Sequence, residues 1–290
     1  MTIIGLPILC ALGAGLVNII VAVTVKGAEH HGCSPAKIGA LSLTTGGLVA
    51  LIVAWTQTGS WLDWRLWMLG VPTGVLCYAC IKTMMRANGL GPPSLPWAMA
   101  NLALVVPIAL SALFLKEPLC WIDGVELAAF GGMLTAFVLG SSHAKDVAIG
   151  NRGRLILLLT LILVFNGFLM FGFKLNSLLP AEVNHSALPL VMYASGSLLS
   201  WMDELRKPRR KYLLREICWG GGMGIGNGTA ILLLLVAMKL PAVVAFPIVQ
   251  GVSFLGGICV TAVIFKEHLN RWKITGIILG LAVILLSVWR

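Results

Sequence analysis

The chain has 290 residues, of which 58% are hydrophobic and only 11% are charged, and its mean hydropathy is +0.94. Soluble domains carry about 25% charged residues, so the composition excludes an ordinary soluble enzyme, a disordered protein and a disulfide-rich secreted domain. The formal net charge of +10 comes from basic residues that lie between apolar runs, so we expect no nucleic-acid partner.

Ten apolar runs follow one another along the chain, each close to the length that a membrane helix needs. They cover residues 4–25, 37–56, 66–86, 94–115, 122–140, 154–174, 186–202, 213–238, 242–265 and 272–289. Charges or turn signals such as Ser34-Pro35 and Gly91-Pro92-Pro93 separate them. Because the runs are continuous and do not alternate like barrel strands, they predict an all-α integral membrane protein with ten transmembrane helices.

Residues recur between the two halves of the chain at a nearly constant offset. The recurring sets are Phe114-Leu115-Lys116-Glu117 with Ile264-Phe265-Lys266-Glu267 (offset 150), Asn18 and Lys26 with Asn166 and Lys174 (148), and Gly70 and Gly74 with Gly220 and Gly224 (150). They predict two five-helix repeats, in residues 1–145 and 146–290. Since five is odd, the second repeat must be inverted in the membrane, which places a binding site at the midplane between the repeats.

This pattern resembles the drug/metabolite transporter superfamily in its EamA-like, ten-helix form. The resemblance lies in the two halves of five helices, in the Lys-Glu step after the fourth and ninth helices, and in residues 242–286. The lysine after the first helix and the Lys-Glu near the end are also similar to the sugar-uptake branches of the rhamnose and glucose-uptake type. The resemblance implies alternating access around a central cavity, with amino acids, sugars, nucleotide sugars or cations as substrates.

Polar side chains deep in the membrane are the candidates for substrate binding, because they are costly there. They are Asn18, Asn166, Asn227, Tyr78, Asn101, Tyr193, Gln250 and Ser253. Amides and hydroxyls both donate and accept hydrogen bonds, so they suit a polar uncharged ligand. The alternative is interhelical hydrogen bonding, which is common in membrane bundles. For Asn18 and Asn166 the repeat favours the cavity.

Lysines and acids lie at the helix ends. Lys26, Lys174 and Lys82 either reach the lipid headgroups or guard the mouths of the cavity and attract an anionic group. For the helix-end motif of Lys116, Glu117, Lys266 and Glu267 we expect local ion pairs or helix caps, and not proton carriers. No acid lies at mid-bilayer depth in these spans, so we predict no buried carboxylate carrier.

Gly220, Gly224 and Gly228 repeat every four residues, which predicts close packing of a neighbouring helix or mobility during gating. The spacing fits no phosphate-binding loop. Cys77 and Cys80 lack a second pair and His30-His31 lacks a third ligand, so we expect no metal and no cofactor.

Basic residues also predict the orientation. The connections after the odd-numbered spans hold 16 Lys and Arg, against 5 on the other side. The positive-inside rule therefore places the 16 in the cytoplasm and both termini outside, in the plasma (inner) membrane of a bacterium. Many EamA-like relatives are expected to have cytoplasmic termini, so this orientation departs from the resemblance.

Together these features predict a secondary active transporter or facilitator of a small polar metabolite, acting as a monomer or homodimer in membrane lipid, and not an enzyme. An exporter of amino acids or drugs with the same fold is the alternative. An integral-membrane enzyme would need clustered His, Asp or Glu at one membrane face, or a nucleophile beside a base. A non-transporting membrane scaffold is the remaining class.

Overall fold

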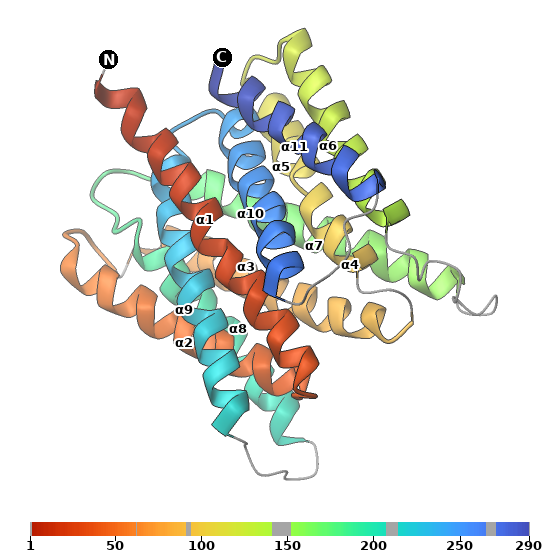
Figure 1. Ribbon diagram of the computed structural model, residues 1–290. Coiled ribbons are helices and arrows are strands. Elements are labelled where there is room, and N and C mark those ends of the chain that lie inside the picture. The colour runs from red at the N-terminus through yellow and green to blue at the C-terminus, as the bar shows by residue number, and fades with distance from the viewer. Residues whose placement is uncertain are drawn as a thin grey trace.

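The apolar runs form helices in the computed structural model, which describes residues 2–61, 63–90, 94–140, 152–206, 214–264 and 271–289 (Figure 1). Within those ranges the regular structure is α-helical, apart from one isolated bridge between Ser60 and Val183. The helices are α1 (Thr2–His30), α2 (Pro35–Thr56), α3 (Trp64–Asn88), α4 (Ser94–Leu102), α5 (Val105–Phe114), α6 (Trp121–Gly140), α7 (Arg152–Asn176), α8 (Ala187–Leu205), α9 (Leu214–Ala237), α10 (Ala242–Ile264) and α11 (Arg271–Trp289).

Eight segments of the described chain are long and apolar enough to cross a membrane, judged by length and composition. These features are those of an all-α integral membrane protein. The eight do not include α8 and α11, so the number of ten spans remains a prediction. One of the eight, Leu95–Phe114, combines α4 and α5.

The break between α4 and α5 has a local cause. Pro107 has no N–H to donate to the carbonyl of Ala103, four residues earlier, and its ring crowds that carbonyl. The helix therefore ends at Leu102 and starts again at Val105, with a short turn in which the Val106 N–H donates to the Ala103 carbonyl. The sequence predicted a single helix over residues 94–115, and the structure replaces it with two.

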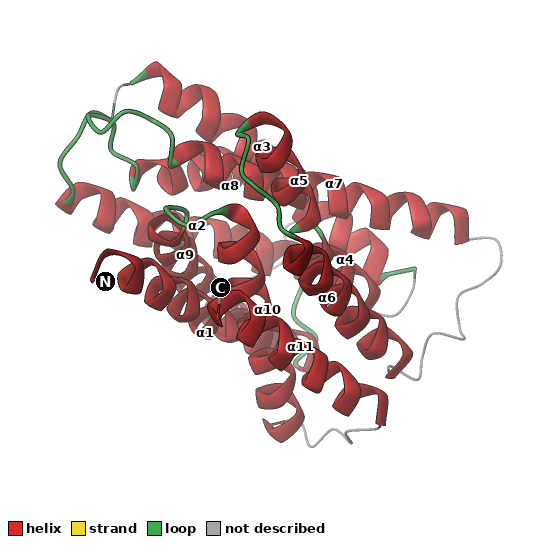
Figure 2. Ribbon diagram, turned by 90° about the horizontal axis from the view of Figure 1, so that it is seen from above, coloured by secondary structure: helices red, strands yellow, loops and turns green. Residues whose placement is uncertain are grey.

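Helices from the first half of the chain pack mainly on helices from the second half (Figures 1 and 2). The first helix, α1, packs along α9 and α10, and α2 packs along α8 and α9. In the same way, α7 packs along α3, α4 and α5, while α8 packs along α3. The remaining pair, α6 and α11, lie against each other at one side of the bundle.

Glycines allow the close crossing of α9 over α2. A Cβ atom added at Gly220 would lie 2.7 Å from the Leu41 Cβ, and one added at Gly228 would lie 3.1 Å from the Gly46 Cα. At Gly224 the added atom would collide with the Thr45 hydroxyl. Cβ atoms added at Gly220 and Gly224 would contact five residues of α2, namely Ile38, Leu41, Ser42, Thr45 and Gly46. The four-residue glycine spacing therefore serves helix packing in this structure.

The crossing of α3 over α8 has the same contacts at positions shifted by 150 residues. A Cβ atom added at Gly70 would lie 2.7 Å from a methyl group of Val191, and one at Gly74 would collide with the Ser195 hydroxyl. Cβ atoms added at Gly70 and Gly74 would contact five residues of α8, namely Leu188, Val191, Met192, Ser195 and Gly196. Each is 150 positions beyond its counterpart on α2, as Gly220 and Gly224 are beyond Gly70 and Gly74.

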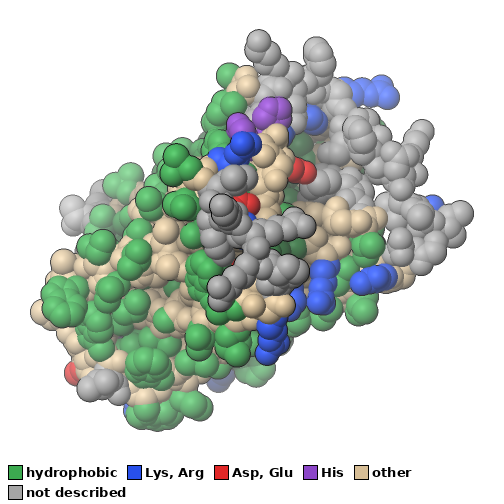
Figure 3. All heavy atoms as spheres, turned by 90° about the horizontal axis from the view of Figure 1, so that it is seen from below, with side chains coloured by type: hydrophobic (Ala, Val, Ile, Leu, Met, Phe, Trp, Pro, Cys, Tyr) green, Lys and Arg blue, Asp and Glu red, His purple; other side chains and the backbone are tan. Residues whose placement is uncertain are grey.

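Hydrophobic side chains also cover much of the outer surface. Leu6, Ile52, Trp121, Val263 and Trp289 are among the many large apolar side chains that are exposed. Figure 3 views the molecule from the end at which α1 terminates, and Lys, Arg and His side chains gather there beside broad hydrophobic areas. An apolar flank with a basic end is the surface expected of a helix bundle in lipid.

Candidate functional site

A cavity of about 550 Å³ opens at the end of the bundle where α1 and α3 terminate and α2 and α11 begin. Eight helices contribute to it: α1, α2, α3, α4, α6, α9, α10 and α11. Its apolar wall includes Met84, Trp97, Phe137, Met223 and Phe254. Among its described lining residues, Lys26, Glu29 and Lys273 are charged. A concave site of this size, mainly apolar with a few charged groups, is typical of a small-molecule site.

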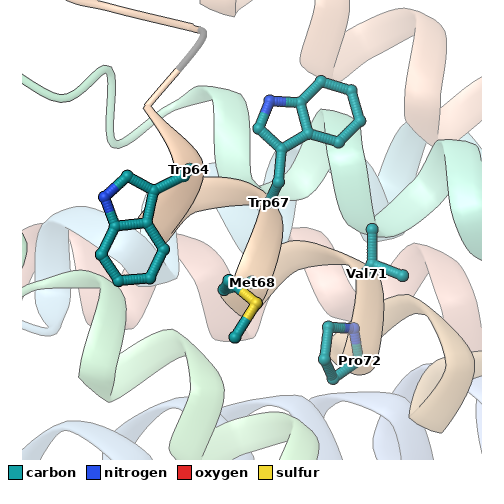
Figure 4. Close-up of a pocket in the computed structure, with 5 residues that line it drawn as sticks. All are labelled: Trp64, Trp67, Met68, Val71 and Pro72. Atoms are coloured by element: carbon teal, nitrogen blue, oxygen red, sulfur yellow. The ribbon is translucent and has the colours of Figure 1, made fainter.

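A second hollow, of about 630 Å³, lies on the flank of α3 (Figure 4). Its lining residues Trp64, Trp67, Met68, Val71 and Pro72 all come from that one helix. Trp64 and Met68 are mostly exposed, and none of the described residues that line the hollow is charged. It is an apolar groove on the outer surface, where lipid chains would lie, so the eight-helix cavity is the candidate site.

The eight deep polar residues expected to bind substrate do not line this cavity. The Asn166 amide donates to the Ala100 carbonyl at 2.6 Å and so joins α7 to α4, whereas the Asn101 amide donates to Trp97 within α4. The Gln250 amide contacts the Met170 sulfur at 3.9 Å. Asn166 and Gln250 therefore lie at helix interfaces, and the alternative of interhelical hydrogen bonding describes Asn166.

The others of the eight are also placed away from the cavity lining. Tyr193 is fully buried with its ring against Gly46, and its hydroxyl makes no hydrogen bond of normal geometry among the described residues, although Asn227 is its polar neighbour. The Tyr78 hydroxyl is a hydrogen-bond partner of Lys82. Ser253 is buried and Asn18 is half-buried. Depth along a helix was readable from the sequence, but the direction in which each side chain points was not.

The three lysines expected at the cavity mouths differ in their surroundings. Lys26 lines the cavity near the end of α1. Lys82 is about one-third exposed and lies 3.1 Å from the Asp203 carboxylate of α8, outside the cavity lining. Lys174 is buried, and its Nζ lies 2.6 Å from Glu117 Oε1. Only Lys26 of the three is therefore positioned to meet a solute in this cavity.

The Lys174–Glu117 pair ties three segments together. The Lys174 ammonium also donates to the carbonyls of Met238 and Leu240, which follow the end of α9. The second carboxylate oxygen of Glu117 accepts the N–H of Ala242, the first residue of α10, at 2.8 Å. A cation near carbonyls at a helix end and an anion at a helix start are both favoured by the helix dipole.

Glu117 thus caps a helix and forms an ion pair, but the partner is not its neighbour Lys116. Lys116 itself adopts a left-handed backbone with φ of 56°, at the turn that follows α5. The second copy of the motif, Lys266 and Glu267, lies outside the described residues.

A second buried ion pair was not predicted from the sequence. The Lys37 ammonium lies 3.1 Å from Glu216 Oε2, and Glu216 Oε1 accepts the Ser34 N–H at the start of α2 at 3.2 Å. Glu216 therefore joins α9 to the N-terminus of α2. The sequence offers one signal for it, an acid in the first turn of a span that follows a strongly basic loop.

Three acids are buried near the starts of their helices. Asp123, Glu126 and Glu216 are each less than 5% exposed. The Ser287 hydroxyl of α11 donates to the Glu126 carboxylate, and the Cys120 N–H donates to Asp123. All three acids belong to the first two turns of their helices. Their burial therefore does not test the prediction that no acid lies at mid-bilayer depth.

Comparisons with known proteins show the fold and do not name a family. No family model matches the chain, and no curated protein matches it. A solved structure described only as "Crystal structure of protein" is similar over 96% of this chain and 98% of its own, with a TM-score of 0.71 and 19% identity. At that identity the likeness shows that the fold is an existing one, and nothing about activity.

Proposed function

We propose that this protein is a secondary transporter or facilitator that moves a small metabolite across a membrane by alternating access. In this proposal the cavity lies between two inverted five-helix repeats, residues 1–145 and 146–290. The chain is then similar to the EamA-like transporters of the drug/metabolite transporter superfamily. The observation that carries the proposal is the exchange of equivalent contacts between the two halves.

That exchange supports a two-fold axis between the two halves. Gly74 of the first half meets Ser195 of the second, while Gly224 of the second half meets Thr45 of the first. Gly224 lies 150 residues after Gly74, and Ser195 lies 150 residues after Thr45. Each contact therefore has a counterpart in which the two halves are exchanged. In a two-fold arrangement, if residue i of one copy contacts residue j of the other, then j of the first contacts i of the other.

Two further pairs of contacts follow the same rule. Gly167 of α7 packs on Val106 of α5, and Gly256 of α10 packs on Ile19 of α1, with offsets of 148 and 150. Between α6 and α11, Phe137 packs on Gly276 at one end, and the Glu126 carboxylate accepts a hydrogen bond from Ser287 at the other. These contacts are equivalent, because Ser287 lies 150 residues after Phe137 and Gly276 lies 150 residues after Glu126. With five spans in each half, such an axis lies in the membrane plane, as in transporters with inverted repeats.

The two ends of the bundle also differ, as alternating access requires. The cavity is lined by residues in the second half of α10, such as Phe254 and Ile258. The first residue of α10, Ala242, is held with Glu117 and Lys174, about 18 Å from Phe254 and about 24 Å from Ile258 along the helix axis. In this proposal the cavity marks the open end of the bundle, and the opposite end, where Lys174 pairs with Glu117, is the closed one. Another buried ion pair, Lys37–Glu216, lies near the cavity end. The charge distribution makes the open end cytoplasmic in this proposal.

Solute counterflow in proteoliposomes tests the proposal. Vesicles that contain the purified protein are loaded with one unlabelled solute and given a trace of the labelled form, for a panel of amino acids, sugars, nucleotide sugars, organic acids and organic cations. We expect labelled solute to accumulate for one chemical class and not in protein-free vesicles. If folded protein exchanges no member of the panel, transport of these classes is contradicted, and chemical conversion of a solute would point to the membrane enzyme.

A further inference from the structure

The wall of the eight-helix cavity is built for an apolar body. Phe137 and Phe254 stack edge to face with ring centroids 5.0 Å apart, and they lie on different helices, α6 and α10. Trp97 of α4, Met84 of α3 and Met223 of α9 complete this part of the lining. Aromatic faces and thioethers bind planar or aliphatic groups, and they adapt to the shape of the ligand.

Hydrogen-bonding groups are scarce in the same lining. Among its described residues there is one amide, Asn88, and there is no Ser, Thr, Tyr or Gln. A sugar would have to leave most of its hydroxyls without partners there, at a cost of about 1–3 kcal/mol for each buried group. The lining therefore disfavours the uncharged polar ligand that the depth of the amides in the sequence had suggested.

The described lining of the cavity carries a positive formal charge. Lys26 and Glu29 lie in the last two turns of α1, and Lys273 is the third residue of α11. Two cations and one anion leave a formal charge of +1 on the described lining. Lys26 and Lys273 also interact within the protein, but each ammonium has three N–H donors and can bind an anion as well.

We propose that the cavity binds an amphipathic organic anion, with an apolar or aromatic body against Trp97, Phe137 and Phe254 and a single acid group near Lys26 and Lys273. The movement of this anion across the membrane rests on the proposed function, whereas its binding does not. The walls select the body, and the two lysines select an acid over an amine.

Four small probes separate the contributions of body and charge. They are 3-phenylpropionate, 3-phenylpropylamine, 3-phenylpropan-1-ol and propionate, measured by calorimetry and thermal shift on the full chain in lipid nanodiscs, with empty nanodiscs subtracted. We expect 3-phenylpropionate to bind at least ten-fold more tightly than the amine or the alcohol, and propionate to show no binding. Ligand binding to the folded protein also raises its apparent Tm.

Variants assign the acid group to the lysines. Lys26→Gln and Lys273→Gln are each expected to weaken 3-phenylpropionate about ten-fold and to leave 3-phenylpropan-1-ol unchanged. Trp97→Leu is expected to weaken both. Lys82→Gln is the matched control, because Lys82 lies outside the lining and pairs with Asp203. If either glutamine variant fails to fold, Lys26→Arg and Lys273→Arg must retain the preference for the acid.

Several outcomes would overturn the proposal. They are equal or tighter binding of the amine or the alcohol, and equal losses of affinity in Lys26→Gln, Lys273→Gln and Lys82→Gln. Binding of 3-phenylpropionate without counterflow of any solute would contradict the proposed transport and leave the anion site intact. Counterflow of another solute without binding of the acid would contradict the anion site and leave transport intact.

Discussion

Lys174 Nζ lies 2.6 Å from Glu117 Oε1, and the two side chains are only 6% and 17% exposed. The pair joins α7 to the segment after α5, and Glu117 extends the link to the N-terminus of α10. Each charge has further partners, since Lys174 donates to two carbonyls and Glu117 accepts a backbone N–H. A buried pair with such partners is costly to break from one side, because the remaining charge is left without its partner.

Single neutral variants of this pair should therefore destabilise the protein strongly. We expect Lys174→Met and Glu117→Gln each to lower the free energy of unfolding by about 3 kcal/mol, and the double variant to lose much less than the sum. The partly exposed pair of Lys82 and Asp203 is the control, for which Lys82→Met should cost less than about 1 kcal/mol. Apparent Tm values in nanodiscs measure both series, and similar losses in the two would contradict the argument.

The glycine crossings make a second prediction, in which two distant sites should respond alike. Gly224→Ala and Gly74→Ala place a methyl group against Thr45 and Ser195 respectively, with the helix backbone of the partner behind them. We expect each to lower stability by about 1–3 kcal/mol through overpacking. Gly131→Ala is the control, since a Cβ at Gly131 meets no atom within 4 Å and alanine favours the helix. Strong loss at one glycine and none at the other would contradict the equivalence of the two crossings.

The sequence allowed the helices and one packing face to be predicted, because apolar length and glycine spacing are local properties. Pro107 lies within the apolar run 94–115, but the sequence did not show that it would end one helix and start another. The partners Lys174–Glu117 and Lys37–Glu216 depend on which helix ends meet in space, and residues 57 and 179 positions apart carry no local signal of that.

The direction in which the amide side chains within the membrane helices point could not be predicted from the sequence either. A membrane helix such as α1 or α7 is apolar on every side, so its sequence does not indicate which side faces a cavity. Asn166 lies at the expected depth but points at the backbone of α4. Lys26, which the sequence placed at a helix end, lines the cavity together with Lys273, which was counted only for orientation.

Substitutions of the polar residues at the helix interfaces should leave ligand affinity unchanged, whether or not they lower stability. The Tyr193 hydroxyl is buried without a hydrogen bond of normal geometry among the described residues, so Tyr193→Phe should change the free energy of unfolding by less than about 0.5 kcal/mol. Asn166→Ala removes the bond to Ala100 and should cost about 0.6–1 kcal/mol. Both variants should bind 3-phenylpropionate like the parent protein. A loss of binding in both variants would instead indicate that Tyr193 and Asn166 contribute to the substrate site.

The orientation of the chain can be tested with two cysteines at opposite ends of the bundle. Cys120 is exposed just before α6, near the closed end, and Asn88 is exposed at the end of α3, beside the cavity. The excess of basic residues at the cavity end predicts that Cys120 faces outward and Asn88 faces the cytoplasm. Two variants are needed, both without the other six native cysteines: one retains Cys120, and the other replaces Cys120 and carries Asn88→Cys. A membrane-impermeant maleimide added to intact cells should label only the first, and after lysis it should label both. Labelling of Asn88→Cys alone in intact cells would reverse the orientation, and the cavity described here would then open to the outside.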